Sequence, residues 1–162
     1  MILLPFTHDV PAETLTAVAT WPHLLADVSA SDSAYFELLA EWWGSDEREL
    51  MTIEHDIVVD VVGIREMLNC QEQWCAAWYP FEAGELYGLG CTKFARSIRL
   101  AVPDLFDRVG EISFTVHPPK HWCSMDFLIT HTVLRERGFT PHLHRLDGIR
   151  HLSKVRSHVA CR

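Results

Sequence analysis

The stretch Leu50–Asp60 (LMTIEHDIVVD) constrains the fold of this chain more than any other segment. Two apolar runs rich in β-branched residues predict a buried strand, but they flank the ionisable triplet Glu54-His55-Asp56. Burying a charge is costly unless the charge is paired or bound to a metal. Two carboxylates one residue apart at a strand end can direct oxygens toward one hard divalent cation. The alternative is a strand that ends at Glu54 and enters a polar loop.

Strand and helix patterns alternate along the rest of the chain. We predict strands over 2–6, 24–29, 50–59, 74–79 and 110–116, and helices over 11–20, 34–43, 63–69, 94–101 and 126–137. This order indicates an α/β sandwich with a mostly parallel central sheet flanked by helices. Because no internal repeat or linker interrupts the pattern, we expect one domain over residues 1–162. Ligands of such sheets bind beyond the carboxyl ends of strands, where the acidic triplet would lie.

Charge and cysteine usage narrow the class of protein. A net charge of −8 disfavours a nucleic-acid-binding module, although residues 145–162 are locally basic and leave contact with a polyanion open. The apolar start at 1–6 is too short for a signal or a membrane span, so we expect no membrane insertion. The five cysteines are an odd number and mostly lie beside apolar residues, which indicates reduced thiols of a cytoplasmic protein.

Three groups of residues are candidates for one site. They are the Glu54/Asp56 pair, Asp126 at the predicted start of a helix, and His151 near the end of the chain. An oxygen-rich set with one imidazole suits Mg²⁺ or Mn²⁺ better than structural Zn²⁺. Taken singly, Asp126 is equally well an N-cap, and His151 a surface residue of the basic tail.

In their order, these motifs resemble the GT-A nucleotide-sugar glycosyltransferases of the family-2-like group. In that group a D-x-D-type motif binds the metal of the sugar nucleotide, an E-D motif at a helix start supplies the catalytic base of inverting members, and a late histidine often completes the metal shell. The resemblance implies a compact GT-A-like (Rossmann-like) sandwich. By position it makes Glu54 a donor-binding residue, Asp56 and His151 metal ligands, and Asp126 the general base.

The resemblance extends upstream. Pro5 ends a first strand as in the family, and Asp27 and Asp32 of the segment DVSASD correspond to acids that contact the nucleoside. The implied donor is a UDP- or GDP-linked sugar, and the acceptor is a glycan, a protein or modified DNA. The E-H-D and G-L-G-C-T-K-F segments also resemble small glycosyltransferase-like proteins of actinobacteria and their phages. Two departures stand out: the 26 residues between Asp27 and Glu54 are fewer than the family usually has, and Asp126 lacks an acidic neighbour.

The mechanism that the resemblance implies follows from charge. Transfer of the sugar leaves a more negative diphosphate, which a cation held by Asp56 and His151 would stabilise, with Glu54 assisting directly or through water. Asp126 would take the proton from the acceptor hydroxyl.

Two other function classes remain open from the sequence. One is a metal-dependent hydrolase or nuclease that uses Asp56 with His142, His144 and His151, and the other is a non-catalytic binding protein with a degenerate transferase fold. Two further groups have two interpretations each. The aromatic residues either stack on a sugar acceptor or fill the core: Trp74, Trp78, Tyr79 and Tyr87. The cysteines at 70, 75 and 91 either bind Zn²⁺ together with a histidine or bind no metal. The C-x4-C spacing of the first two is not the tight spacing of zinc fingers.

Overall fold

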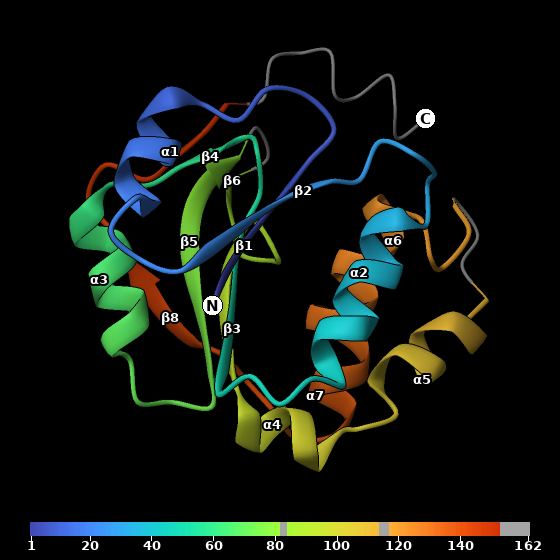
Figure 1. Cartoon of the computed structure of the whole chain (residues 1–162). Coiled ribbons are helices and arrows are strands. Elements are labelled where there is room, and N and C mark those ends of the chain that lie inside the picture. Colours follow the sequence, from blue (N-terminus) through green and yellow to red (C-terminus); the bar gives the residue numbers. More distant parts are fainter. Residues whose placement is uncertain (82–83, 114–116, 153–162) are drawn as a thin grey trace.

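The computed structural model describes residues 1–81, 84–113 and 117–152 (Figure 1). The strands are β1 (Ile2–Phe6), β2 (His23–Asp27), β3 (Glu49–Ile53), β4 (Ile57–Val58), β5 (Trp74–Phe81), β6 (Gly84–Leu86), β7 (Cys91–Ala95), β8 (His142–Arg145) and β9 (Arg150–His151). The helices are α1 (Ala12–Val18), α2 (Ala34–Trp43), α3 (Val61–Asn69), α4 (Arg96–Ala101), α5 (Leu105–Glu111), α6 (Trp122–Phe127), the π-helical η1 (Leu128–Val133) and α7 (Leu134–Glu136).

The central sheet of the described residues has seven strands in the order β2-β1-β3-β7-β5-β6, with β8 paired to β5. β2, β1 and β3 are parallel, β7 is antiparallel to both β3 and β5, and β8 is parallel to β5. All strands except β6 and β7 therefore run in one direction, which confirms the mostly parallel α/β sheet. A separate two-stranded ladder joins β4 to β9.

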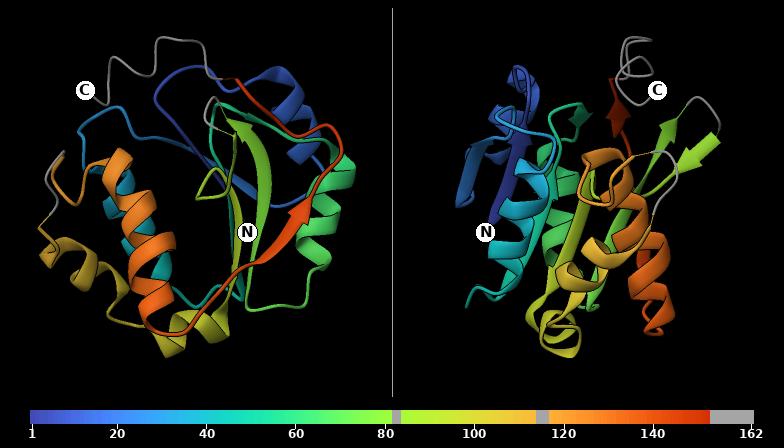
Figure 2. Two further views of the ribbon diagram at one scale, coloured as in Figure 1. Left: turned by 180° about the vertical axis from the view of Figure 1, so that it is seen from behind. Right: turned by 90° about the vertical axis from the view of Figure 1, so that its right-hand side faces the viewer.

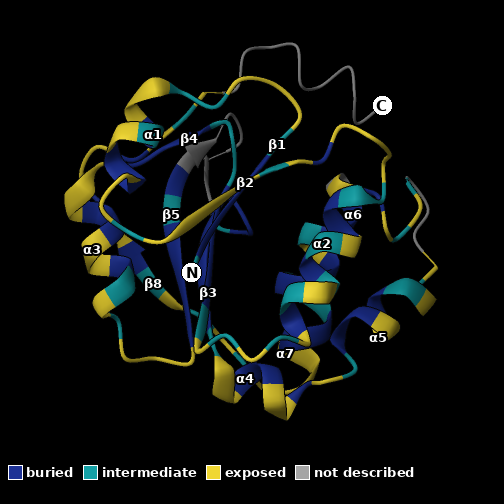
Figure 3. Cartoon of the chain, viewed as in Figure 1, coloured by how far each residue is buried: buried dark blue, intermediate teal, exposed yellow. Residues whose placement is uncertain are grey.

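Helices cover both faces of the sheet (Figures 1 and 2). α1 and α3 lie on one face, and α2, α5, α6 and α7 lie on the other. Strand side chains alternate between the two resulting cores: Leu3 and Leu50 pack on the α2 side, whereas their neighbours Leu4 and Met51 pack on the α1 side. Figure 3 shows the buried strands between helices whose outer faces are exposed.

Local chemistry explains where several helices begin and end. The predicted helix over 34–43 is confirmed residue for residue, with Phe36, Leu39 and Trp43 buried at helical spacing. Asp60 caps α3, because its side chain accepts a 2.8 Å hydrogen bond from the N–H of Gly63. Gly138 follows α7 with φ of +83°, the left-handed conformation typical of a C′ glycine.

Several predicted boundaries differ from the structure. The predicted strand over 50–59 is interrupted, because β3 ends at Ile53 and β4 begins at Ile57. The predicted helix over 94–101 is confirmed from Arg96 onward as α4, but Phe94 belongs to β7, where it pairs with Leu50 of β3 and with Trp74 of β5. Gly110 lies in α5, so the predicted strand over 110–116 does not begin there, and 114–116 lie outside the described residues. The last long helix begins at Trp122, four residues before Asp126, which is therefore inside the helix. None of the described helices is long and apolar enough to cross a membrane.

Candidate functional site

The turn Gly88–Gly90 lies between β6 and β7. It forms hydrogen bonds both with residues at the end of β3 and with Asp126 of α6. The N–H of Leu89 donates a 2.8 Å hydrogen bond to Oδ1 of Asp126, and the carbonyl of Leu89 accepts one from the Thr52 hydroxyl. The carbonyl of Gly90 accepts a 2.9 Å hydrogen bond from the N–H of Glu54. The turn therefore brings Glu54 and Asp126 to the same edge of the sheet.

Both glycines of this turn are required by close packing. A Cβ on Gly88 would overlap the carboxyl of Asp126, and a Cβ on Gly90 would lie 2.8 Å from the hydroxyl oxygen of Tyr79. The close approach of the backbone to the Asp126 carboxyl is what allows the Leu89 hydrogen bond to form. The glycines were visible in the sequence, but their partners were not.

The carboxyl of Asp126 has a pKa above its ordinary value. Burial raises the pKa of its carboxyl to about 6, although the Leu89 N–H, His131 and Thr130 partly oppose the shift. Asp126 as a whole residue is only partly buried. A group with this pKa is ionised at neutral pH and yet basic enough to accept a proton from a bound substrate.

Glu54 follows β3, and the pKa of its carboxyl is also raised by its surroundings. Burial, then the charges of Asp126 and Asp56, raise the pKa of Glu54 well above its ordinary value, and the Tyr35 hydroxyl partly offsets them. Carboxyls repel one another when ionised, so the charges of Asp126 and Asp56 disfavour the ionised form of Glu54. The site would therefore favour a cation among them.

Asp56 and His151 form the second half of the cluster. Nε2 of His151 lies 3.3 Å from Oδ2 of Asp56, and the Leu152 N–H donates a 2.7 Å hydrogen bond to the Asp56 carbonyl, beside the β4–β9 ladder. Burial raises the pKa of Asp56, but the hydrogen bond and charge of His151, with His55, outweigh burial and leave it below its ordinary value. The predicted pair thus comes together through an antiparallel ladder between segments almost 100 residues apart.

The chemistry of this pair fits a hard divalent cation. Oδ1 of Asp56 is buried and has no hydrogen-bond partner among the described residues, so one carboxylate oxygen remains for a ligand. Nε2 of His151 and Oδ2 of Asp56 contact each other at 3.3 Å in a hydrogen-bonded pair, so a cation bound by both side chains would replace this direct bond. Asp56 and His151 are therefore the residues that would hold Mg²⁺ or Mn²⁺.

The other predicted donor-binding residues lie apart from these carboxyls. Pro5 is buried in β1 opposite Ala26 of β2. Asp27 is exposed at the end of β2, and its Oδ1 accepts a 2.9 Å hydrogen bond from the Ser29 N–H, which lowers its pKa together with the Ser29 hydroxyl. Asp32 is exposed in the loop before α2. No hydrogen bond or ion pair within the described ranges links Asp27 or Asp32 to Glu54 or Asp126.

Two tyrosines lie at the site: Tyr35, which the sequence analysis did not single out, and Tyr79, which it considered for acceptor stacking or for the core. Tyr35 of α2 is buried beside Glu54, and burial followed by the charges of Glu54 and Asp126 raises the pKa of its phenol. Tyr79 is buried and stacks on His151 with a centroid distance of 5.7 Å. Helical spacing marks Tyr35 only as a core residue, and no signal in the sequence distinguishes its hydroxyl.

The aromatic residues proposed for acceptor binding divide into core and surface. Trp74 is 2 % exposed and packs in the core, as does Tyr79. Trp78 and Tyr87 are half-buried, with ring centroids 5.7 Å apart, and Tyr87 also packs at 4.6 Å against His131 of the π-helical segment. Because His131 influences the pKa of Asp126, this half-buried aromatic group borders the candidate base.

The cysteines differ from expectation. Cys70 and Cys75 form a disulfide, so the prediction that all thiols are reduced is wrong for this pair. Cys91 is a buried thiol in β7, and burial raises its pKa to about 12. It is not close enough to Cys70 and Cys75 to form a ligand group with them. His144 takes its place: among the described residues, the group of three potential ligands whose donor atoms lie within 4.8 Å of one another is Cys70, Cys75 and His144.

This grouping also bears on the hydrolase hypothesis. Nδ1 of His144 is 2.8 Å from Glu66 of α3, and the His142 ring packs against His144. His144 therefore belongs to the cysteine group, and His142 packs beside it and not at the Asp56–His151 pair.

Comparison with known proteins places the fold. No family model and no curated protein sequence matches this chain. Among solved structures, the chain resembles a glycosyltransferase involved in the glycosylation of the major capsid of PBCV-1, with a TM-score of 0.54, 10 % identity, and coverage of 97 % of this chain and 95 % of that one. It also matches A197 from STIV with a TM-score of 0.48 and 13 % identity over 91 % of this chain and 81 % of that one. The chain thus has a glycosyltransferase-like α/β fold.

Proposed function

We propose that this protein is a metal-dependent glycosyltransferase that transfers a sugar from a UDP- or GDP-linked donor to an acceptor hydroxyl. The observation that carries the proposal is the position of Asp126, which the Leu89 N–H holds beside Glu54 at the carboxyl edge of the parallel strands, with its pKa raised to about 6. The fold shared with a capsid glycosyltransferase supports the same reaction class.

Each residue of the cluster has a separate role in the proposal. Asp56 and His151 would hold Mn²⁺ or Mg²⁺, which supplies neutralisation of the charge on the diphosphate leaving group. Glu54 binds the donor next to this pair, and Asp126 accepts the proton of the acceptor hydroxyl. The half-buried rings of Trp78 and Tyr87, close to His131, provide a surface on which a sugar or another flat acceptor group stacks.

The competing functions make different predictions. A hydrolase built from Asp56 and the three histidines needs His142 and His144 at Asp56, but His144 is bonded to Glu66. A non-catalytic binding protein would not need a carboxyl with a raised pKa next to partly solvent-accessible acids, because burying such a group costs stability. These observations favour the transferase.

A thermal-shift panel tests the proposal. The protein is melted with UDP- and GDP-sugars, each alone, with Mn²⁺ or Mg²⁺, and with the metal alone. We expect one nucleotide sugar at 100 times its Kd to stabilise the fold by about 2.7 kcal/mol, a shift of several degrees, only when metal is present. Stabilisation by metal without any nucleotide effect would favour the hydrolase, and no stabilisation by any combination would leave a binding protein.

A further inference from the structure

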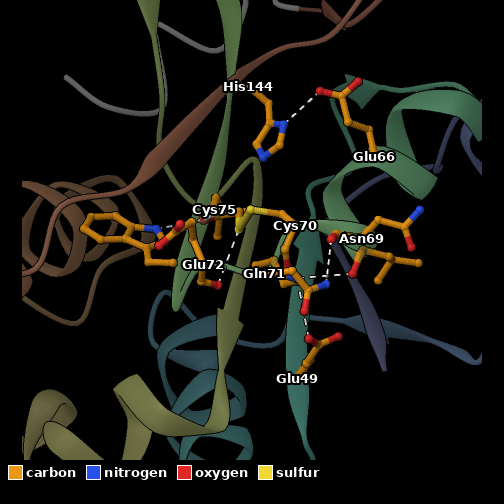
Figure 4. Close-up of a disulfide and its surroundings, with 12 residues drawn as sticks. Glu49, Glu66, Asn69, Cys70, Gln71, Glu72, Cys75 and His144 are labelled. Carbon is orange, nitrogen blue, oxygen red and sulfur yellow. Dashed lines mark hydrogen bonds and ion pairs between the residues drawn. A yellow bond between two sulfur atoms is a disulfide. The ribbon is translucent and has the colours of Figure 1, made fainter.

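A second group of potential ligands lies away from the acidic cluster. Cys75 is near the amino end of β5, whereas Tyr79 and His151 stack near its carboxyl end. Cys70 ends α3, and His144 lies in β8, the strand that pairs with β5. Figure 4 shows these side chains, with the imidazole of His144 above the two sulfurs.

The strand register explains why the imidazole reaches the sulfurs. Cys75 pairs with His142 and Ala77 pairs with His144. Because side chains alternate along a strand, Cys75, Ala77, His142 and His144 share one face of the sheet. Of the two histidines, His142 is exposed, whereas His144 is buried and has a ring nitrogen within 4.8 Å of both sulfurs.

His144 is oriented as a ligand with one nitrogen unused. Its side chain is 9 % exposed, and its Nδ1 is 2.8 Å from Oε1 of Glu66. A carboxylate only accepts, so Nδ1 carries the proton and Nε2 of the neutral ring keeps its lone pair. Nε2 is buried and has no hydrogen-bond partner among the described residues. It faces the sulfurs in Figure 4.

A buried lysine holds the backbone of Cys70. Lys93 pairs with Cys75 across β7 and β5, and its fully buried ammonium donates hydrogen bonds to the carbonyls of Cys70 and Leu68. The same ammonium forms an ion pair with Glu49 at 3.5 Å. These bonds hold the end of α3, and therefore the backbone of Cys70, in place before any metal binds.

We propose that Cys70, Cys75 and His144 form a redox-gated site for a soft divalent cation, of which Zn²⁺ is the best match. The donor atoms already lie within 4.8 Å of one another, and two thiolates with an imidazole are typical Zn²⁺ ligands. Glu66 orients the imidazole from outside, as carboxylates do in many zinc sites. Three protein ligands leave the fourth tetrahedral position to solvent.

Reduction of the Cys70–Cys75 disulfide precedes binding of the metal. A dithiol reductant gives two electrons and two protons to the Cys70–Cys75 bond, which breaks to two thiols while the reductant becomes a disulfide. Binding of Zn²⁺ then forms two Zn–S bonds and releases the two thiol protons. In the oxidised state no thiolate exists, so the disulfide and the metal exclude each other.

The site is distinct from the acidic cluster in its chemistry as well as its place. Carboxylates select Mg²⁺ or Mn²⁺, and thiolates select Zn²⁺ or Co²⁺. Loss of the cysteine site should therefore leave the nucleotide-dependent stabilisation by Mn²⁺ unchanged, so the two proposals fail independently.

The test titrates Co²⁺ into the full chain under anaerobic conditions, before and after reduction and removal of the reductant. We expect the reduced protein to bind one equivalent with the intense visible and sulfur-to-cobalt absorption of a tetrahedral thiolate site, and Zn²⁺ to displace it. The oxidised protein should show no such absorption. Equal Co²⁺ binding by both forms, or no binding by the reduced form, would overturn the proposal.

Variants separate ligation from folding. Glu66→Gln changes a half-exposed side chain, and we expect it to weaken Co²⁺ binding about 10- to 100-fold with unchanged circular dichroism. Cys75→Ser and His144→Ala should remove the sulfur-to-cobalt bands or shift them, whereas the matched controls Cys91→Ala and His142→Ala should keep them. The proposal is overturned if Glu66→Gln binds Co²⁺ like the parent, or if His142→Ala loses the site while His144→Ala retains it.

Discussion

The N–H of Leu89 donates a 2.8 Å hydrogen bond to the carboxyl of Asp126, 37 positions later in the chain. This bond fixes the carboxyl on the side of the helix that faces the end of β3, where Glu54 lies. One oxygen of Asp126 is thereby held by the backbone, so the carboxyl is fixed in place before any substrate binds.

Asp126→Asn should reduce sugar transfer by about 10²- to 10⁴-fold, because an amide cannot accept the proton of the acceptor hydroxyl. The amide oxygen still accepts the Leu89 hydrogen bond, so donor binding should persist. The measurements are initial rates of transfer and the metal-dependent thermal shift with the nucleotide sugar. Transfer at the parental rate would show that Asp126 is not the base.

The transfer rate of the parent protein should fall as the pH is lowered through about 6, the value to which burial raises the pKa of Asp126. Below that pH the carboxyl is protonated, and the rate should decrease about tenfold per pH unit. A pH profile of kcat/KM for the free enzyme measures this. A flat profile between pH 5 and 7, with the protein folded throughout, would contradict the assignment.

Asp126→Asn should also make the fold more stable at neutral pH. The folded-state pKa of Asp126 is raised from 3.8 to about 6, so between these values the folded protein binds more protons than the unfolded chain, and stability falls as pH rises. Asparagine removes this penalty. Urea unfolding at pH 7.5 should show a gain of roughly 1–3 kcal/mol, reduced by residual solvent screening, that disappears near pH 4.

The control for this stability change is Asp46→Asn, which alters a fully exposed carboxylate paired with Arg96. Its effect should be small and nearly the same at both pH values. A stability gain in Asp126→Asn that does not depend on pH would mean that burial of the charge is not its cause.

Gly88→Ala should impair both folding stability and transfer, because the added Cβ would overlap the Asp126 carboxyl and displace it from the Leu89 N–H. Overpacking of this kind typically costs about 1–3 kcal/mol. Gly110→Ala, within α5, is the matched control. Its Cβ would lie 3.4 Å from the flexible end of Lys120 and 4.0 Å from the Phe36 ring. Alanine there should be neutral or slightly stabilising. Equal melting temperatures for the two variants would contradict the packing argument.

Asp56→Asn should remove most of the nucleotide-sugar binding. The binding that remains should no longer depend on metal. The amide carries no charge with which to hold a divalent cation, although its shape is preserved. Thermal shifts at increasing Mn²⁺ concentration measure the loss, and Asp46→Asn serves again as the control. An unchanged Mn²⁺ dependence in Asp56→Asn would exclude Asp56 as a ligand.

Short-range patterns in the sequence predicted most of the regular structure. The helix over 34–43, the first strand and the glycine after α7 follow from side-chain spacing and local backbone preference, which act over a few residues. The same reasoning failed for Phe94, because the five residues of β7 (CTKFA) include Thr92 and Lys93 and show no strand alternation, whereas Phe94 and Ile98 have helical spacing. Only pairing with β3 and β5 decided between them.

By itself the sequence determined which acids and imidazoles the protein has, and that Glu54 and Asp56 lie between two buried apolar runs. The tertiary structure decided what surrounds them: Leu89 at Asp126, His151 at Asp56, and His144 at Cys70 and Cys75. Each of these contacts joins residues dozens of positions apart, through strand pairing or a turn packed against a helix. A pKa and a ligand group depend on such neighbours, since desolvation and charge act through space and not along the chain.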